Sequence, residues 1–404
     1  MSFTAPSPPF DHRRIIALDA LRGAAVGGIA LMNIYVYALP SPAYFNPLAA
    51  GYEGVADIAV WATSFVFVDN KFRTLFAMLF GLGCAILFER DDNNPLLRHY
   101  ARMAVLFLFG LAHAILLANN DILRLYAVCG LLLPFVFDLG VRQLWLCTGA
   151  LMAAHVGMGT VGALGWFAGG FGATADTLAL ANAVFGTDPE TIASLDQRNV
   201  ESFSERIERR ADGALEALLV LSSSLVLNLS AMLAGIALWR GGLLKGEWDA
   251  ARTRRLALVT ASIAIPALSA FAWLNIATNF HPGLVGGVAL FWSAPFDLLL
   301  GIAYAALAML AFARGGWLTR RLTAAGRLSL TNYVATSLIF ALLFYSWGAG
   351  LYRAFSRVEL FALAFLPMAL MLVWSPLWLG FFRQGPLEWL WRSLSAVRPK
   401  PFLR

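Results

Sequence analysis

Long apolar stretches alternate with short polar clusters along the whole chain, and this alternation is its strongest structural signal. A helix needs roughly 20 apolar residues to cross the hydrocarbon core of a bilayer. Because a backbone in lipid must satisfy its own hydrogen bonds, stretches of this length are expected to be helices. The stretches lack the period-two alternation of a membrane barrel. The pattern therefore predicts an all-α, polytopic transmembrane bundle of about ten spans, with nine to eleven as the range.

The expected spans follow the apolar stretches closely. Their ranges are 15–38, 70–89, 100–118, 122–139, 143–168, 213–239, 256–278, 286–313, 328–347 and 358–382. Residues 51–69 are apolar but are interrupted by Asp57 and Asp69. We interpret this segment as a partly immersed or re-entrant entry to the second span. If it is a full span instead, the topology changes by one crossing.

Composition and charge placement support this interpretation. Charged residues make up only 13% of the chain, against about 25% in soluble domains, which argues against a soluble enzyme. The net charge of +6 would by itself be compatible with nucleic-acid binding. However, most Lys and Arg residues collect at one set of span ends, as the positive-inside rule requires. We therefore expect both termini in the cytoplasm and no nucleic-acid partner.

One long polar stretch divides the chain into two halves. Residues 169–212 are expected to form an extracytoplasmic loop, either a plain linker or a lid that binds an acceptor over the outer face. Residues 1–168 form an N-terminal five-span half that holds the candidate active-site motifs. Residues 213–404 form a C-terminal five-span half. The glycine-rich helices would permit a homodimer.

Ionisable side chains inside apolar spans are the first functional candidates, since each costs about 2.5–3.5 kcal/mol on insertion scales. Asp19 and Arg22 lie three residues apart on one face of the first span, and Asn33 lies near the same face. These residues form either an interfacial ion pair beside a packing seam or one wall of an active cavity.

The pair Arg102 and His113 is the most suggestive. The two residues are eleven positions apart, which is three helical turns, so they share a face and are separated by roughly 16 Å. Arg102 would lie at the cytoplasmic mouth of a cavity through the bundle, and that cavity would end at His113, past the middle of the membrane. Asp121 would orient His113 and raise its basicity. Alternatively, Asn119, Asn120 and Asp121 are ordinary helix caps.

Asp297 falls near the middle of its span. It is expected to pair with Lys71 or Arg73, or else to mark a proton route. The cysteines Cys84, Cys129 and Cys147 show no metal or disulfide spacing, and no metalloprotease motif is present. We expect no bound metal.

Several motifs resemble those of the YeiB-like family of bacterial membrane proteins. They occur in order over nearly the whole chain, at 14–23 (RIIALDALRG), 69–76 (DNKFRTLF), 110–113 (GLAH), 326–333 (GRLSLTNY) and 385–392 (GPLEWLWR). Thr336 departs from the family pattern, where Gln is expected. The resemblance implies a multi-pass protein of the bacterial inner membrane.

More distant resemblances imply a reaction. The first motif is similar to the opening of heparan-alpha-glucosaminide N-acetyltransferase, and the Arg-x10-His spacing resembles membrane acyltransferases that O-acetylate sugars. Both imply transfer of an acyl group, expected to be acetyl, from cytoplasmic acyl-CoA to a small-molecule, sugar or lipid acceptor. The acceptor would be reached from the membrane or its outer face.

The resemblance also suggests residue roles. His113 would be a general base or transient acyl carrier, with Asp121 as its partner, and Asn33 or Asn332 would polarise the thioester. The groups expected to bind the CoA phosphates are Arg22, Arg98, Arg102 and Arg327. A rival hypothesis is a proton-coupled transporter or flippase that uses Asp19, Asp121 and Asp297. A third is a scaffold without catalysis.

Overall fold

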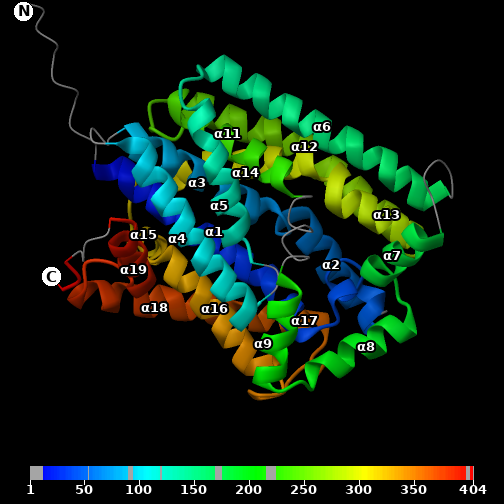
Figure 1. Ribbon diagram of the computed structural model, residues 1–404. Helices are drawn as coiled ribbons and strands as arrows, with labels where there is room; N and C mark the ends of the chain where they lie inside the picture. Colours follow the sequence, from blue (N-terminus) through cyan, green and yellow to red (C-terminus); the bar gives the residue numbers. More distant parts are fainter. Residues whose placement is uncertain are drawn as a thin grey trace, which may run out of the picture.

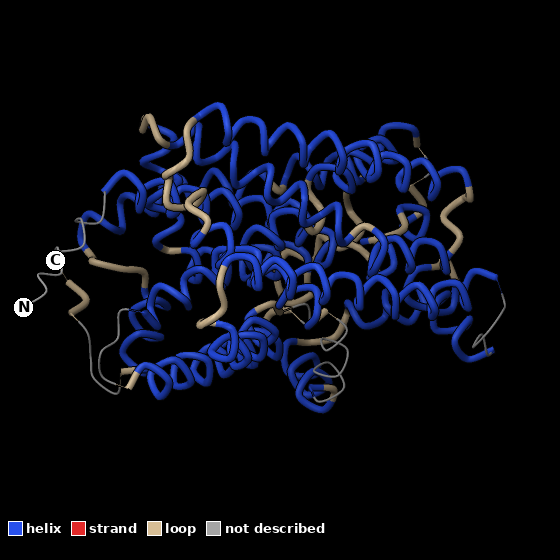
Figure 2. The backbone as a smooth tube through the Cα atoms, turned by 90° about the horizontal axis from the view of Figure 1, so that it is seen from above, coloured by secondary structure: helices blue, strands red, loops and turns tan. Residues whose placement is uncertain are grey.

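The computed structural model describes residues 12–52, 54–89, 94–118, 121–168, 175–214, 224–396 and 401–403. These residues form helices joined by mostly short loops and contain no strand (Figures 1 and 2). Their only β contact is an isolated bridge between Phe382 and Leu403. The prediction of an all-α polytopic bundle is confirmed. Asn119, Asn120 and parts of the predicted segments 169–212 and 213–239 lie outside the described residues.

The helices of the first half alternate between long spans and short connectors. In order they are α1 (His12–Ala38), η1 (Ser41–Tyr44), η2 (Pro47–Ala50), α2 (Val55–Phe67), α3 (Lys71–Glu89), α4 (Pro95–Leu116), α5 (Leu123–Leu132), η3 (Leu133–Val136), α6 (Val141–Ala168), α7 (Ala175–Phe185), α8 (Pro189–Asn199) and α9 (Phe203–Asp212).

The second half continues in the same way. Its helices are α11 (Leu225–Arg240), α12 (Ala250–Ala277), α13 (Pro282–Gly287), the π-helical turn η4 (Val288–Trp292), α14 (Ala294–Phe312), α15 (Trp317–Arg327), α16 (Ser329–Phe344), α17 (Arg357–Leu363), α18 (Phe365–Phe381) and α19 (Pro386–Ser395).

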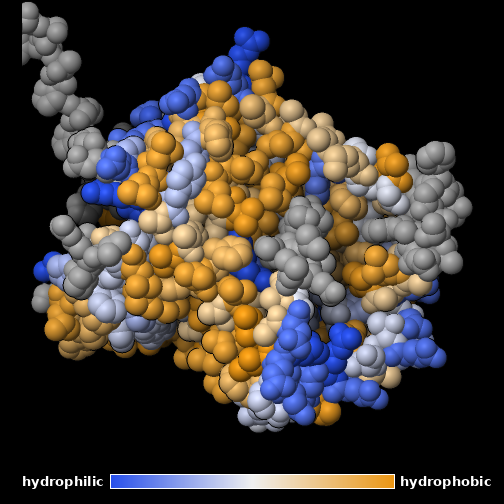
Figure 3. Space-filling view, viewed as in Figure 1, coloured by the Kyte–Doolittle hydropathy of each residue, from blue (hydrophilic) through white to orange (hydrophobic). Residues whose placement is uncertain are grey.

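Seven of the described helical segments are long and apolar enough to cross a membrane, and the bent pair α15–α16 would make eight. Shorter apolar helices occur at Leu123–Val136, Leu225–Arg240 and Pro282–Trp292. The first two coincide with expected spans, so the count of ten stays a prediction. Figure 3 shows an apolar band between polar residues at the upper left and over α8 and α9 at the lower right. This distribution is the one that a bilayer requires.

The segment before the second span does not fold back as a re-entrant loop. α2 and α3 together make one candidate span of 35 residues, which is about 52 Å at the helical rise. Among the described helices, the one pair bent by more than 40° at such a break is α15–α16, which turns by 85°. The helix in 51–69 is therefore an extension of the second span, interrupted at residues 68–70.

The polar helices α8 and α9 lie against the 345–353 loop at the end of the bundle away from the N-terminus of α1 (Figure 1). Asp196 accepts hydrogen bonds from Tyr352 (3.0 Å) and Arg353 (2.6 Å). Arg209 makes two hydrogen bonds with Glu201, at 2.7 and 2.8 Å, and these lower the pKa of the Glu201 carboxyl. This end of the bundle is covered, but whether α8 and α9 act as a lid stays a prediction.

A buried ion pair fixes the break between α2 and α3. Lys71 Nζ lies 2.7 Å from Asp297 Oδ1, and the two side chains are 1% and 2% exposed. Lys71 also donates to the Phe65 carbonyl, and Ser293 Oγ donates to Asp297 Oδ2 at 2.9 Å. The partner expected for Asp297 is thus Lys71, while Arg73 bonds instead to Asn70. The pair joins the start of α3 to α14, next to the π-helical turn.

Replacing one member of this pair should destabilise the protein strongly, because the other charge is then buried alone. We expect Lys71→Met to lower the free energy of unfolding by about 3–5 kcal/mol. The double variant Lys71→Met/Asp297→Leu should recover most of that loss. Unfolding in detergent measures both, with the exposed Arg320→Gln as control. A double variant no more stable than Lys71→Met would contradict the assignment.

Candidate functional site

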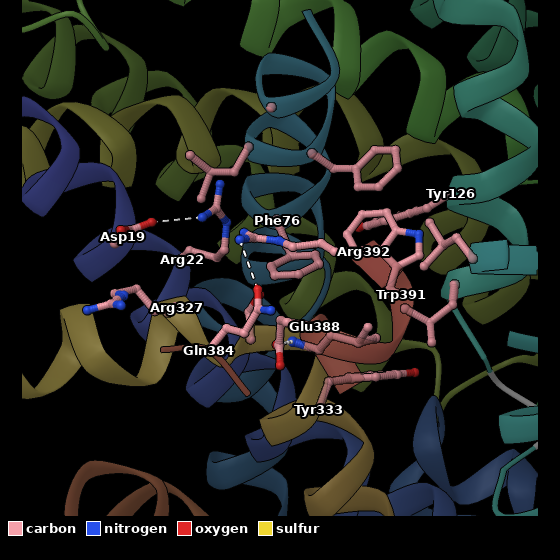
Figure 4. Close-up of a pocket in the computed structure, with 18 of the residues that line it drawn as sticks. Asp19, Arg22, Phe76, Tyr126, Arg327, Tyr333, Gln384, Glu388, Trp391 and Arg392 are labelled. Carbon is pink, nitrogen blue, oxygen red and sulfur yellow. Dashed lines mark hydrogen bonds and ion pairs between the residues drawn. The ribbon is translucent and has the colours of Figure 1, made fainter. Parts of the chain in front are cut away.

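A cavity of about 320 Å³ opens at the end of the bundle where α1 begins and α19 ends (Figure 4). Its walls are formed by α1, α3, α4, α5, α16 and α19, together with the end of α15. The side walls are apolar and include Phe76, Phe80, Leu106 and Leu123. Polar groups gather at the mouth. The cavity is therefore amphipathic along its length.

The mouth carries more positive than negative charge. Its guanidinium groups are those of Arg22, Arg327, Arg383 and Arg392, and its carboxylates are those of Asp19 and Glu388. Arg22 Nη1 lies 2.8 Å from Asp19 Oδ1, and Arg392 Nη1 donates to Gln384 Oε1 at 3.1 Å. The Asp19–Arg22 pair expected on α1 is present, and it lines the cavity.

A wider groove of about 990 Å³ adjoins this mouth. It shares Arg383, Gln384, Trp391 and Arg392 with the cavity and adds Arg98 and Arg102 from α4. All four arginines expected to bind an anion therefore lie around one continuous opening. The charge and the apolar depth suit a ligand with an anionic head and a long, thin tail.

α19 builds this opening by binding two other helices. Trp391 Nε1 donates to the Arg102 carbonyl of α4 at 2.9 Å. Glu388 Oε1 accepts from the Leu330 and Thr331 amides, and Oε2 accepts from Thr331 Oγ1 at 2.5 Å. The bend leaves α16 without a side-chain cap of its own, so Glu388 satisfies its first amides. Burial raises the pKa of the Glu388 carboxyl, although these hydrogen bonds oppose the shift.

Beyond the inner end of the cavity lies a chain of three buried polar side chains. His113 Nδ1 is 2.9 Å from Asp121 Oδ1, and Nε2 is 2.9 Å from Ser337 Oγ. Asp121 Oδ2 accepts from the Arg124 amide at 2.8 Å. When Nδ1 carries the proton and donates it to Asp121, Nε2 is left to accept from the Ser337 hydroxyl.

The cavity does not reach the imidazole, contrary to the expectation that it would end there. The Tyr333 ring forms its inner end and packs on the His113 ring, with centroids 5.0 Å apart. His113 is 4% exposed. Among the described residues, the Tyr333 hydroxyl makes one long contact, accepting from the Ile122 amide at 3.5 Å. One aromatic ring thus separates the cavity from the polar chain.

The chain is similar to known bacterial proteins over nearly its whole length. An uncharacterized protein of Escherichia coli (strain K12), YeiB, is 32% identical over 96% of this chain and 98% of its own length. The chain belongs to the YeiB-like family. An uncharacterized Bacillus subtilis protein, YxaH, is 25% identical over 98% of both chains. A family model described as a protein of unknown function (DUF418) matches residues 238–398. No solved structure matches.

Two asparagines expected to polarise a substrate lie elsewhere in this YeiB-like protein. Asn33 is half-buried on α1 and does not line the cavity. Asn332 donates to the Ala325 carbonyl at 2.9 Å and to Ser375 Oγ at 3.2 Å, and it accepts from Trp374 Nε1 at 2.8 Å. Because both ends of its amide are engaged, Asn332 holds α15 and α18 at the bend and is not free to contact a substrate.

Several residues of the site were not among the sequence-predicted candidates. They are Ser337, Tyr333, Arg383, Glu388 and Arg392. The motifs at 326–333 and 385–392 contain three of them, so these motifs were a usable signal. Ser337 gave none, because a serine in an apolar helix is ordinary. Among the described residues, no group of three or more His, Cys, Asp or Glu side chains could hold a metal ion.

The cap on α16 leads to a test of how the mouth is held. In the YeiB-like chain, Glu388→Ala should leave three donors without partners, at about 1–3 kcal/mol each. Asp249→Ala is the matched control, since Asp249 caps α12 through the Arg252 amide at an exposed position. It should cost only about 1 kcal/mol. Unfolding in detergent compares the two, and equal losses would show that Glu388 does not hold the bend.

Proposed function

We propose that this protein is an acyl-CoA-dependent membrane acyltransferase that moves an acyl group, expected to be acetyl, to an acceptor reached from the membrane or its outer face. The observation that carries the proposal is the hydrogen-bonded chain Ser337–His113–Asp121, placed directly behind the inner end of a cavity with a basic mouth. The same three groups in this order activate a hydroxyl in serine hydrolases.

The opening fits acyl-CoA in its chemistry. The nucleotide end carries three phosphate groups, and guanidinium groups bind phosphate through charge-assisted, often paired hydrogen bonds. Arg98, Arg102, Arg383 and Arg392 line the groove in which that end would lie. The narrower cavity, with its apolar walls, would receive the pantetheine arm and direct the thioester toward Tyr333.

His113 supplies the base in this proposal. Nε2 accepts the proton of the acceptor hydroxyl or amine, and the acceptor atom attacks the thioester carbonyl carbon as the C–S bond breaks. The departing CoA thiolate takes the proton from the imidazolium. Asp121 keeps Nδ1 protonated and stabilises the charged ring. Ser337 marks the position, 2.9 Å from Nε2, from which His113 takes a proton.

Tyr333 must turn aside for the thioester to meet His113. Its hydroxyl makes only a 3.5 Å contact with the Ile122 amide, so the ring is held by packing more than by hydrogen bonds. A rotation about its side-chain bonds would join the cavity to the polar chain. Closure of the ring behind the thioester would then exclude water during transfer.

The rival transporter hypothesis rests on the intramembrane acids. Asp297 is paired with Lys71 and Asp19 with Arg22, and Asp121 contacts both His113 and Arg124. Each described acid of this set therefore has a basic partner, which favours a structural or orienting role over proton carriage. Uptake by proteoliposomes under a proton gradient, without any acyl-CoA, would favour transport instead.

Removing the base should slow transfer strongly but leave the fold intact. We expect His113→Ala to reduce transfer of labelled acetyl from acetyl-CoA into membrane-vesicle products by about 10²–10⁴-fold. Asp121→Asn should cause a large part of the same loss. Acetyl-CoA binding by purified His113→Ala should remain.

His155→Ala is the matched control, because His155 is also buried and its one hydrogen bond to a described residue is with the Leu290 carbonyl, at 2.9 Å. It should retain activity. Transfer that persists in His113→Ala would refute the assigned base. The same assay tests Ser337. If Ser337→Ala loses as much activity as His113→Ala, and labelled acetyl is found bound to Ser337 in wild-type protein, the acyl group passes through Ser337.

The groove leads to a separate binding test. Arg98→Gln/Arg102→Gln should weaken binding of acetyl-CoA by about 10–100-fold, with a shallower salt dependence, because two charge-assisted contacts are lost. Binding of S-acetylpantetheine, which lacks the phosphates, should not change. Calorimetry measures both, with Arg320→Gln as control. Equal losses for the two ligands would place the phosphates elsewhere.

A further inference from the structure

A second hollow, of about 650 Å³, lies at the same basic end of the bundle but shares no lining residue with the cavity or its groove. α12 and α14 form its sides, and the turn between α11 and α12 closes it. The apolar lining includes Leu243, Trp248, Leu307 and Leu310. Arg254 and Arg314 supply the charge.

The two arginines of this hollow are available to a ligand. Both side chains are exposed, and no carboxylate of the described residues pairs with either one. Asp249, on the same turn, is already engaged, since it accepts from the Arg252 amide at 2.8 Å. The hollow thus presents two exposed guanidinium groups, one on α12 (Arg254) and one just after the end of α14 (Arg314).

The floor of the hollow is fixed in place. The Trp248 indole donates to the Gly241 carbonyl at 2.7 Å, and the Arg252 guanidinium stacks over the indole ring at 3.7 Å from its centroid. An aromatic side chain held in this way beside arginines at a span end is typical of the membrane–water interface. The position of Trp248 is therefore set by contacts within the protein.

The hollow is continuous with apolar surface on the same two helices. Leu258 on α12 is 64% exposed, and Leu307 on α14, which lines the hollow, is 48% exposed. In a membrane these side chains face lipid. A ligand in this position would have its anionic part at Arg254 and Arg314 and an apolar part along α12 and α14.

We propose that this hollow is a binding site for one anionic phospholipid of the leaflet at the basic end of the bundle, which the positive-inside rule assigns to the cytoplasm. Its phosphate accepts hydrogen bonds from Arg254 and Arg314. Its acyl chains lie against Leu307, Leu310 and Leu258. The site is independent of acyl transfer, because it shares no residue with the proposed acyl-CoA path.

Native mass spectrometry of the full-length protein, released from nanodiscs of equal phosphatidylglycerol and phosphatidylcholine, tests this site. We expect wild-type protein to retain one phosphatidylglycerol molecule in preference to phosphatidylcholine. Arg254→Gln/Arg314→Gln should lower that retention about tenfold, because each arginine near the surface adds to the attraction of an anionic lipid. Arg255→Gln/Arg320→Gln removes the same charge from exposed positions outside the hollow and should retain the lipid.

Two further measurements test whether the variants fold and whether the bound ligand is a lipid. Both double variants should unfold at the wild-type temperature in phosphatidylcholine alone, which shows that they fold. Millimolar glycerol 1-phosphate should not displace the retained lipid; displacement would mean that the site recognises a soluble phosphate. Equal retention of the two lipids by wild-type protein, or equal losses in the two double variants, would overturn the proposal.

Discussion

The 85° bend between α15 and α16 sets the arrangement of everything around the cavity. A helix that begins inside a bundle has amides without helical partners, and no water is at hand to bind them. Here Glu388 accepts from two of those amides, and Asn332 ties the bend to α15 and α18. α15 can therefore lie along α1 at the mouth while α16 enters the bundle with Tyr333 and Ser337.

The mouth and the inner end of the cavity are therefore connected through a short stretch of chain. Arg327 at the end of α15 lines the mouth, and Tyr333 on the second turn of α16 closes the inner end. α19 supplies both Glu388 to the bend and Arg392 to the groove. The groove residue Arg392 and the capping residue Glu388 thus lie on the same helix, about one turn apart.

The length of the apolar stretches was sufficient to predict the fold class, because a lipid environment leaves the backbone few alternatives. Contacts close in sequence were also predictable: Asp19 with Arg22, and His113 with Asp121 across the end of one helix. The expected pairing of Asp297 with a base near residue 71 followed from the cost of an isolated charge in lipid. These predictions rest on constraints that act locally or on each side chain alone.

The contacts between helices far apart in the sequence could not be predicted, since they depend on how those helices pack. Ser337 reaches His113 over 224 positions of sequence, and nothing in its own helix distinguishes it from a packing serine. Asn332 looked like a substrate contact because it is polar and intramembrane, but three hydrogen bonds to α15 and α18 already occupy it. The cap on α16 comes from Glu388. The sequence around Glu388 does not indicate that it binds the first amides of α16.

The ring of Tyr333 has an electrical consequence. A water-filled shaft from the basic mouth to an imidazole in the opposite half of the bundle would bring bulk solution close to the other side and thin the insulating layer. With Tyr333 on one side of His113 and the paired rings of Tyr37 and Tyr345, 5.4 Å apart, further along, aromatic packing replaces that shaft with a dry barrier. In a membrane, this packing would keep the insulating layer thick around His113.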